Sequence, residues 1–254
     1  MLENRVIPIL LVKNDGLVKT TKFSDPKYVG DPINAIRIFN EKEVDELVLL
    51  DISASPANRG PNFDLVKDVA SECFMPLAYG GGISGVEDAR RLFSLGVEKV
   101  VMRSAAVKDL RVVTEIAKFA GASSVAVSVD VKRSRFGRLQ LFAPGCPLDG
   151  DSDWAGFIYR ATEAGAGEIL LNSVDQDGVM AGMNIEMIKT ITPTMKVPLV
   201  AIGGVGSLDH IRAAIHAGAN AVGAGAFFVY HGPRRAVLIT YPTYDELSKL
   251  LGKE

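Results

Sequence analysis

The chain of 254 residues is 48% hydrophobic and carries a formal net charge of −2 at pH 7, which argues against a nucleic acid or an anionic membrane as its partner. A chain of this length can bury a large core, and α/β barrels of this size usually form a single domain. The sequence has no apolar run of 18 residues and no signal-peptide pattern, so we expect a soluble, cytoplasmic protein without a membrane span.

Short apolar segments alternate with amphipathic segments along the chain. The expected strands cover residues 5–12, 46–52, 75–79, 99–102, 124–131, 168–171, 198–202 and 219–224. The expected helices cover residues 32–39, 63–73, 86–95, 108–120, 154–164, 185–191, 208–217 and 244–251. Continuous apolar strands are typical of a parallel sheet that is covered on both faces. The pattern therefore favours a closed (β/α)8 barrel, a TIM barrel of the α/β class, with an open doubly wound sheet as the alternative.

Two connections are longer than a simple turn requires. Residues 13–29 form a polar connection, and connections of this length are often functional. Residues 132–153 are expected to form a loop that bears a hairpin, with Arg138–Phe142 as one arm, followed by Pro144, Gly145 and Pro147.

A glycine turn, Gly80-Gly81-Gly82, follows the expected strand at 75–79. Ser84 and Glu87 have the spacing of a capping box at the start of the next helix. Backbone amides that glycines leave accessible at such a turn can bind a phosphate-sized anion. The turn therefore predicts an anion site.

The same pattern recurs 122 residues later, where Gly203 and Gly204 match Gly81 and Gly82. Other pairs share this offset: Pro76 and Pro198, Leu77 and Leu199, Gly96 and Gly218, Val100 and Val222, and Glu46 and Glu168. A repeat of this length indicates duplicated half-barrels, at about residues 1–123 and 124–254. Two such halves would place two anion sites across one mouth of the barrel, which suits a ligand with two phosphates.

Active sites of such barrels lie at the carboxyl ends of the strands. Asp130 follows a mostly apolar strand, and burial there would let its carboxyl act as a general acid or base; a cap on a loop amide is an equal alternative. Lys19 in the first long connection can fold over a phosphate, although a solvated lysine is the more common outcome. Other candidates at these ends are Leu11, Lys13, Asp51, Ser53, Arg103, Ser104, Lys132, Asn172, Ser173 and Asp177.

The starts of the strands carry a second charged set, namely Arg5, Glu46, Lys99 and Glu168. These four residues should converge at the amino-terminal mouth of a barrel. They predict either a stabilising ion network or a charged ring that admits a small polar molecule.

The sequence contains no cluster with metal-ligand spacing, because His210, His216 and His231 are not at HxH or i,i+4 positions. We therefore expect neither a metal nor another cofactor. Cys73 and Cys146 are too few for a disulfide framework and are expected to be reduced.

Several motifs resemble those of HisF, the cyclase subunit of imidazole glycerol phosphate synthase, over nearly the whole chain. The matching segments are residues 5–8 (RVIP), 30–32 (GDP), 45–52 (DELVLLDI), 80–83 (GGGI), 104–107 (SAAV), 165–171 (GAGEILL) and 175–178 (DQDG). The resemblance implies a half-barrel duplicate with two phosphate sites for a phosphorylated small molecule. It also implies a HisH-like glutaminase on the amino-terminal face, which releases ammonia into the barrel through a gate of one Arg, one Lys and two Glu. Arg5, Glu46, Lys99 and Glu168 match that gate.

The carboxyl-end face departs from the family. HisF cyclases carry a catalytic Asp at the end of the first strand, and this chain has Leu11 there, while the second catalytic Asp is kept as Asp130. Further departures are Arg103 for Asn, Asn172 for Thr and Ala226 for a small hydroxyl residue. Lys19 and Asp177 are retained. The first phosphate site (Gly81, Gly82, Ser104) is complete. The second site, at Gly203 and Gly204, has no hydroxyl, because Ala226 stands in place of the hydroxyl residue.

A leucine neither donates nor accepts a proton, and the loss of one member of an acid–base pair costs about 10²–10⁴-fold in rate. The resemblance therefore points to the HisF-like subgroup of the AglZ and WbuZ type. That subgroup is associated with acetamidino modification of nucleotide-linked sugars for surface polysaccharide, together with a HisH-like glutaminase and a separate amidotransferase. The alternatives are a histidine-pathway cyclase in which Asp51 or Lys13 replaces the missing Asp, and a non-catalytic scaffold that activates the glutaminase.

Overall fold

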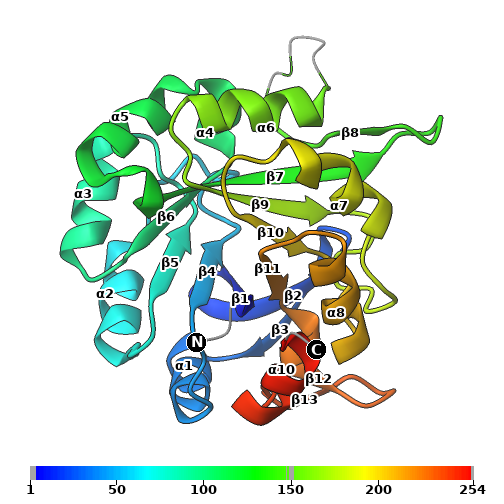
Figure 1. The fold of residues 1–254 in the computed structure, drawn as a ribbon. Helices are drawn as coiled ribbons and strands as arrows, with labels where there is room; N and C mark the ends of the chain where they lie inside the picture. Colours follow the sequence, from blue (N-terminus) through cyan, green and yellow to red (C-terminus); the bar gives the residue numbers. More distant parts are fainter. Residues whose placement is uncertain (1–3, 147, 149–151, 253–254) are drawn as a thin grey trace.

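The computed structural model describes residues 4–146, 148 and 152–252. Its centre is a closed barrel of parallel strands, surrounded by helices (Figure 1). The barrel strands are β1 (Arg5–Lys13), β4 (Leu47–Asp51), β5 (Leu77–Gly80), β6 (Lys99–Met102), β7 (Val125–Arg133), β9 (Glu168–Ser173), β10 (Leu199–Ile202) and β11 (Ala221–Ala224). The barrel closes where β11 pairs in parallel with β1, with Arg5 opposite Ala221. This pairing confirms the (β/α)8 barrel and excludes the open doubly wound sheet.

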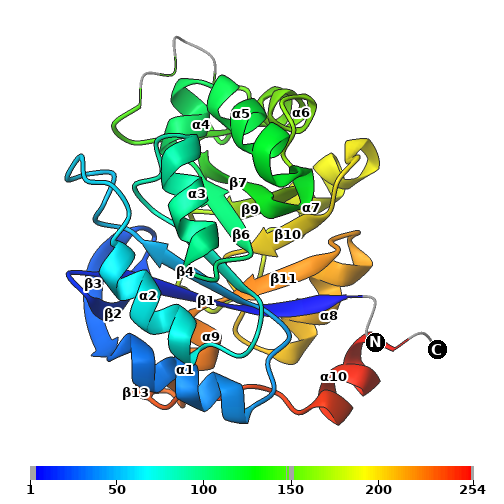
Figure 2. The same cartoon turned by 90° about the vertical axis from the view of Figure 1, so that its left-hand side faces the viewer.

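The helices follow the strands in the alternation that the sequence predicts. They are α1 (Pro32–Glu41), α2 (Phe63–Glu72), α3 (Val86–Ser94), α4 (Ser104–Lys108), α5 (Arg111–Ala120), α6 (Trp154–Glu163), α7 (Ile185–Ile191), α8 (Leu208–His216), α9 (Ala226–Val229) and α10 (Tyr244–Leu251). Short 3₁₀ turns lie at Ala122–Ser124 and Thr192–Thr194. Helix α10 packs near the start of β1 (Figure 2), where the Tyr241 hydroxyl donates to the carbonyl of Val6 at 2.7 Å.

Two details of the expected helices are wrong. The expected helix at 108–120 is split, because Asp109 is extended (φ −160°, ψ 110°) and ends the short α4, and α5 begins only at Arg111. The expected capping box at Ser84 and Glu87 does not form. Instead, Asp88 accepts from the amide and the hydroxyl of Ser84, at 2.8 and 2.7 Å.

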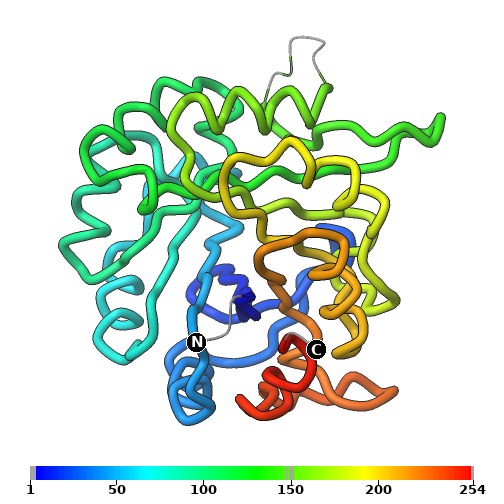
Figure 3. The backbone as a smooth tube through the Cα atoms, in the orientation of Figure 1, coloured from blue at the N-terminus to red at the C-terminus, as the bar shows by residue number. Residues whose placement is uncertain are grey.

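Both long connections contain antiparallel strands. Residues 13–29, expected as a polar loop, instead form the strands β2 (Gly16–Thr21) and β3 (Ser24–Gly30), which extend the sheet from the end of β1 (Figure 2). The hairpin expected in residues 132–153 is confirmed, because β8 (Leu139–Leu141) pairs with β7 and projects from the barrel (Figure 3). Pro147 lies outside the described residues. A further hairpin joins β12 (Tyr230–His231) to β13 (Ala236–Val237).

Apolar side chains form two separate clusters. The larger one fills the space between the strands and the helices, and it takes Ile169 and Leu171 from β9. The smaller one fills the inside of the barrel and takes Leu170 from the same strand. Successive side chains of a strand point to opposite faces, so every second side chain of each barrel strand points toward the barrel axis.

The offset of 122 residues found in the sequence also separates whole elements of the structure. The pairs α1 and α6, β5 and β10, α3 and α8, and β6 and β11 each begin at positions 122 residues apart. The two halves therefore correspond in the order and spacing of their elements, with the short α4 and α9 in equivalent places.

Candidate active site at the carboxyl ends of the strands

A cavity of about 340 Å³ opens at the carboxyl ends of the barrel strands. The residues that the sequence and the family resemblance assign to catalysis and ligand binding all line it. They are Leu11, Lys19, Gly81, Gly82, Arg103, Ser104, Asp130, Asn172, Asp177, Gly203 and Gly204. Four further candidates from the strand ends, Lys13, Ser53, Lys132 and Ser173, are not part of the lining.

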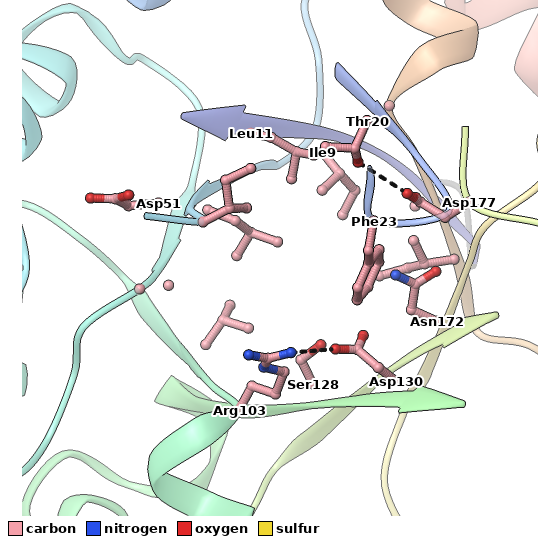
Figure 4. A pocket seen from close by; sticks show the side chains of 18 of the residues that line it. Ile9, Leu11, Thr20, Phe23, Asp51, Arg103, Ser128, Asp130, Asn172 and Asp177 are labelled. Carbon is pink, nitrogen blue, oxygen red and sulfur yellow. Dashed lines mark hydrogen bonds and ion pairs between the residues drawn. The ribbon is translucent and has the colours of Figure 1, made fainter. Parts of the chain in front are cut away.

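Arg103 and Asp130 form an ion pair on one wall of this cavity (Figure 4), where Nη1 of Arg103 donates to Oδ2 of Asp130 at 3.2 Å. Asp130 is only 4% exposed. Burial raises the pKa of Asp130 to about 6, although the nearby Arg103 charge acts in the opposite direction. A carboxyl with this pKa can take up or release a proton near neutral pH.

Lys19 and Asp177 occupy another part of the cavity wall. The ammonium of Lys19 donates to the carbonyl of Ile9 at 2.6 Å, and burial lowers the pKa of Lys19 to about 8 against the attraction of Asp177. Burial also raises the pKa of Asp177, whose carboxylate accepts from the hydroxyl of Thr20 at 3.2 Å. The amide of Lys22 donates to the carbonyl of Asp177 at 2.9 Å, so the β2–β3 hairpin is attached to the loop after β9.

Leu11 faces the cavity from β1, across from Arg103 and Asp130 (Figure 4). Ile9 and Leu50 extend this apolar surface toward the barrel interior. The cavity therefore has an acid–base group on one wall and an aliphatic side chain on the other.

Asp51 and Lys13, the two candidates for replacing the missing carboxylate, do not fill that role. The carboxylate of Asp51 points away from the cavity centre (Figure 4) and accepts from the amide and hydroxyl of Ser53, at 2.8 and 2.6 Å. Lys13 is exposed at the end of β1.

The two glycine turns lie on the cavity wall in conformations that exclude other residues. Gly81 has φ +120°, and a Cβ there would lie 2.4 Å from the carbonyl oxygen of Asp51. Gly204 has φ +100°, and a Cβ there would lie 2.0 Å from the carbonyl oxygen of Gly182. Both turns therefore present backbone rather than side chains to a ligand. Ser104 lines the cavity near the first turn with a hydroxyl, whereas Ala226, its counterpart in the second half, offers none.

Asn172 carries an unusual buried acceptor. Its side chain is nine-tenths buried, and its Oδ1 has no hydrogen-bond partner among the residues that the structure describes. A buried polar atom without a partner costs free energy. This oxygen lies beside the second glycine turn, because a Cβ on Gly203 would be 2.8 Å from it.

Sequence reasoning missed several residues of this cavity, notably Thr20, Phe23, Ser128 and Gly225. Thr20 and Phe23 were not predicted to line the cavity, because residues 13–29 were expected to form a polar loop. Gly225 lies 122 residues after Arg103, so the repeat itself could have identified it.

The other end of the barrel holds the second charged set. Arg5 contacts both Glu46 and Glu168. Lys99 also contacts both, at 3.1 Å from Glu46 and 2.6 Å from Glu168. The four side chains therefore alternate in charge around a closed ring, and the contacts with Glu168 and Glu46 raise the pKa of Arg5 despite its burial.

Within the described ranges, no group of three or more His, Cys, Asp or Glu side chains is arranged to hold a metal ion. No helix in the same part of the chain is long and apolar enough to cross a membrane. Cys73 and Cys146 are free thiols.

Comparison with known proteins places these features in context. The family model for histidine biosynthesis proteins matches residues 5–233. A protein of Pseudomonas aeruginosa, provisionally named imidazole glycerol phosphate synthase subunit hisF2, is 50% identical over 248 residues, covering 97% of this chain and 99% of the relative. A Leptospira borgpetersenii protein, provisionally named subunit HisF of the same enzyme, is 46% identical over 95% of this chain and 96% of its own length. A Vibrio vulnificus protein, provisionally named subunit hisF3, is 45% identical over 99% of this chain and 97% of its own length.

Proposed function

The chain belongs to the histidine biosynthesis protein family, and we propose that it is the HisF-like synthase subunit of a glutamine amidotransferase complex. In this proposal a HisH-like glutaminase docks on the amino-terminal face, and ammonia passes through the barrel to the cavity. The ammonia is used for acetamidino modification of a nucleotide-linked sugar in surface polysaccharide synthesis, together with a separate amidotransferase. The observation that carries the proposal is Leu11, which faces Asp130 across the cavity while the charged ring is complete.

The route for ammonia follows the barrel axis. Strand β9 places Glu168 in the ring, Leu170 in the apolar interior and Asn172 in the cavity. These positions span about 13 Å at about 3.3 Å per residue. Because the interior between them is apolar, it favours a small neutral molecule such as ammonia over an ion, which would lose its hydration there.

The cavity argues against the two-carboxylate chemistry of a HisF cyclase. Leu11 supplies neither a proton donor nor an acceptor, and the remaining carboxylate, Asp130, is already paired with Arg103. The loss of one member of such a pair is expected to reduce cyclisation by about 10²–10⁴-fold.

The HisF-type names of the relatives support a partnership with a glutaminase subunit. The proposal also includes a boundary between the half-barrels near residues 123 and 124, and a cytoplasmic location. The 122-residue offset between equivalent elements supports that boundary.

The test is reconstitution with the HisH-type glutaminase encoded in the same genome. We expect binding of the two proteins, glutamine hydrolysis that depends on the complex, and little cyclisation of the HisF ribonucleotide substrate. The Leu11→Asp, Arg103→Asn double variant is the matched control, because it restores two of the four family residues, including the catalytic Asp, and should raise cyclisation. Cyclisation at a normal rate by the unaltered chain would overturn the proposal.

The names of the relatives favour one alternative, a cyclase subunit of imidazole glycerol phosphate synthase in histidine biosynthesis. That function requires the unaltered chain to rescue a histidine auxotroph that lacks HisF. Rescue by the double variant alone would support the amidotransferase role. Stimulation of the glutaminase without any amidated product, when the candidate acceptor and amidotransferase are supplied, would instead indicate a non-catalytic scaffold.

A further inference from the structure

Arg103 contacts the catalytic candidate Asp130 and the serine of the first anion site. One terminal nitrogen donates to Asp130 at 3.2 Å, and the other donates to the hydroxyl of Ser104 at 3.1 Å. Ser104 and Gly82 line the same cavity. The structure places Arg103 in the cavity, with its side chain 25% exposed. A guanidinium has further N–H groups beyond these two, so it can also bind an anion.

At the equivalent place of the second half-barrel, a cation reaches in from the first half of the chain. Gly225 lies 122 residues after Arg103 and has no side chain to offer. The space is taken by Lys19, because a Cβ on Gly225 would lie 2.5 Å from the Lys19 ammonium. A cation therefore lies at this place beside both glycine turns, although Arg103 and Lys19 both belong to the first half of the chain.

The two cations differ in one respect that matters for ligand binding. The Lys19 ammonium has a backbone carbonyl, that of Ile9, as its hydrogen-bond partner. Arg103 is bound to the carboxylate of Asp130. An anion at the first turn must therefore compete with Asp130 for the guanidinium. Asp177 attracts the Lys19 ammonium at the second turn, but among the described contacts the hydrogen bond of Lys19 goes to Ile9 instead.

We propose that Arg103 is shared between Asp130 and the anionic group of a ligand at the first glycine turn, so that ligand binding releases Asp130 from its ion pair. This inference rests on the anionic ligand of the proposed function. Without the ligand, Arg103 neutralises the carboxylate beside it. With an anion at Gly81 and Gly82, the guanidinium turns to the anion and Asp130 becomes available to hold a proton. Asn172 lies opposite Asp130 on the neighbouring strand β9, so the released carboxyl keeps a polar side chain beside it.

The experiment uses inorganic phosphate as the probe and the amide NMR signals of Gly82 and Gly204 to report the two turns separately. The full chain, Arg103→Gln, Asp130→Asn and the double variant are titrated. We expect Arg103→Gln to weaken phosphate binding at Gly82 about tenfold. We expect Asp130→Asn to strengthen it about threefold or more, because the guanidinium is then free.

The decisive quantity is the coupling between the two substitutions. If Arg103 is shared, Asp130→Asn should strengthen binding when Arg103 is present and have much less effect when it is combined with Arg103→Gln. Equal effects of Asp130→Asn in both backgrounds, or no phosphate response at Gly82 in the full chain, would overturn the proposal. Lys19→Met is the control, since it should weaken binding at Gly204 and leave Gly82 unchanged.

Arg103→Lys replaces Arg103→Gln if the latter does not fold. It keeps the charge but offers fewer N–H groups in a less fixed geometry, so its binding at Gly82 should be intermediate and its coupling to Asp130 smaller. No glutaminase takes part in these titrations. A failure of ammonia transfer therefore leaves this test intact, and a failure here leaves ammonia transfer to be judged separately.

Discussion

Replacement of Lys99 by Met is expected to destabilise the protein by about 2–4 kcal/mol. Lys99 bridges Glu46 and Glu168, whose side chains are 8% and 5% exposed. Removing one partner from a buried ion pair costs about 3–5 kcal/mol, because the remaining charge is left buried. The loss should lie at or below the lower end of that range, since Arg5 still contacts both carboxylates and the Lys99 side chain is 16% exposed.

Lys196→Met is the matched control. Lys196 pairs with Glu163 at 2.9 Å, within the range of the Lys99 contacts, but these two side chains are 63% and 51% exposed. Exposed pairs contribute about 0–1 kcal/mol, so the control should change stability by less than that. Methionine keeps an unbranched apolar stem in both variants, which leaves the charge as the main difference.

The measurement is urea unfolding of the three proteins, followed by two spectroscopic probes whose transitions should coincide. Equal losses for Lys99→Met and Lys196→Met, or a loss below about 1 kcal/mol for Lys99→Met, would refute the account of the ring as a buried ion network. In the reconstituted complex, Lys99→Met should also release ammonia to solvent, so that glutamine hydrolysis exceeds product formation. Unchanged coupling would contradict the proposed gate.

Further predictions concern the cavity and its cover. Gly178 and Gly232 both have φ +69°, but only a Cβ on Gly178 would meet a neighbour, the carbonyl oxygen of Thr20 at 2.1 Å. Gly178→Ala should therefore cost roughly 2–4 kcal/mol and Gly232→Ala roughly 1 kcal/mol in thermal unfolding, and equal losses would contradict the contact. Burial raises the pKa of Asp130 to about 6, so the folded protein binds more protons at this site than the unfolded chain, and the site's contribution to stability falls as the pH rises. Asn cannot titrate, so the unfolding free energy of Asp130→Asn minus that of the unaltered chain should increase by roughly 2–3 kcal/mol between about pH 4 and pH 7. Urea unfolding across that pH range measures this difference. A difference that does not change with pH would contradict the protonation of Asp130 in the folded protein.

The barrel was predictable from sequence because its strands are short apolar runs and its two halves share an offset of 122 residues. The hairpin β2–β3 was not, because β3 is exposed along nearly all its length and therefore has no alternation of apolar and polar residues. Its formation depends on pairing with β2, and that is a tertiary effect. The short helix α4 was missed for a similar reason, since five residues are too few to show a helical period.

The positions of the site residues followed from the barrel, since strand ends of a closed parallel sheet must meet at one mouth. Their pairing did not follow. Nothing in the sequence indicates that Arg103 contacts Asp130, or that Lys19 occupies the space beside Gly225, because both contacts depend on side-chain directions across the cavity. The outward orientation of Asp51 could not be predicted either, and it removes a candidate that sequence reasoning offered for the missing carboxylate.

The alternation along β9 restricts how such a protein can evolve. Glu168, Leu170 and Asn172 face the axis, while Ile169 and Leu171 pack against the helices. Insertion or deletion of one residue in this strand would turn a charged side chain into the helix-packed layer and an aliphatic one toward the axis. Lineages can therefore change the chemistry of the mouth only by substitution at fixed positions, as with leucine at position 11 and arginine at position 103.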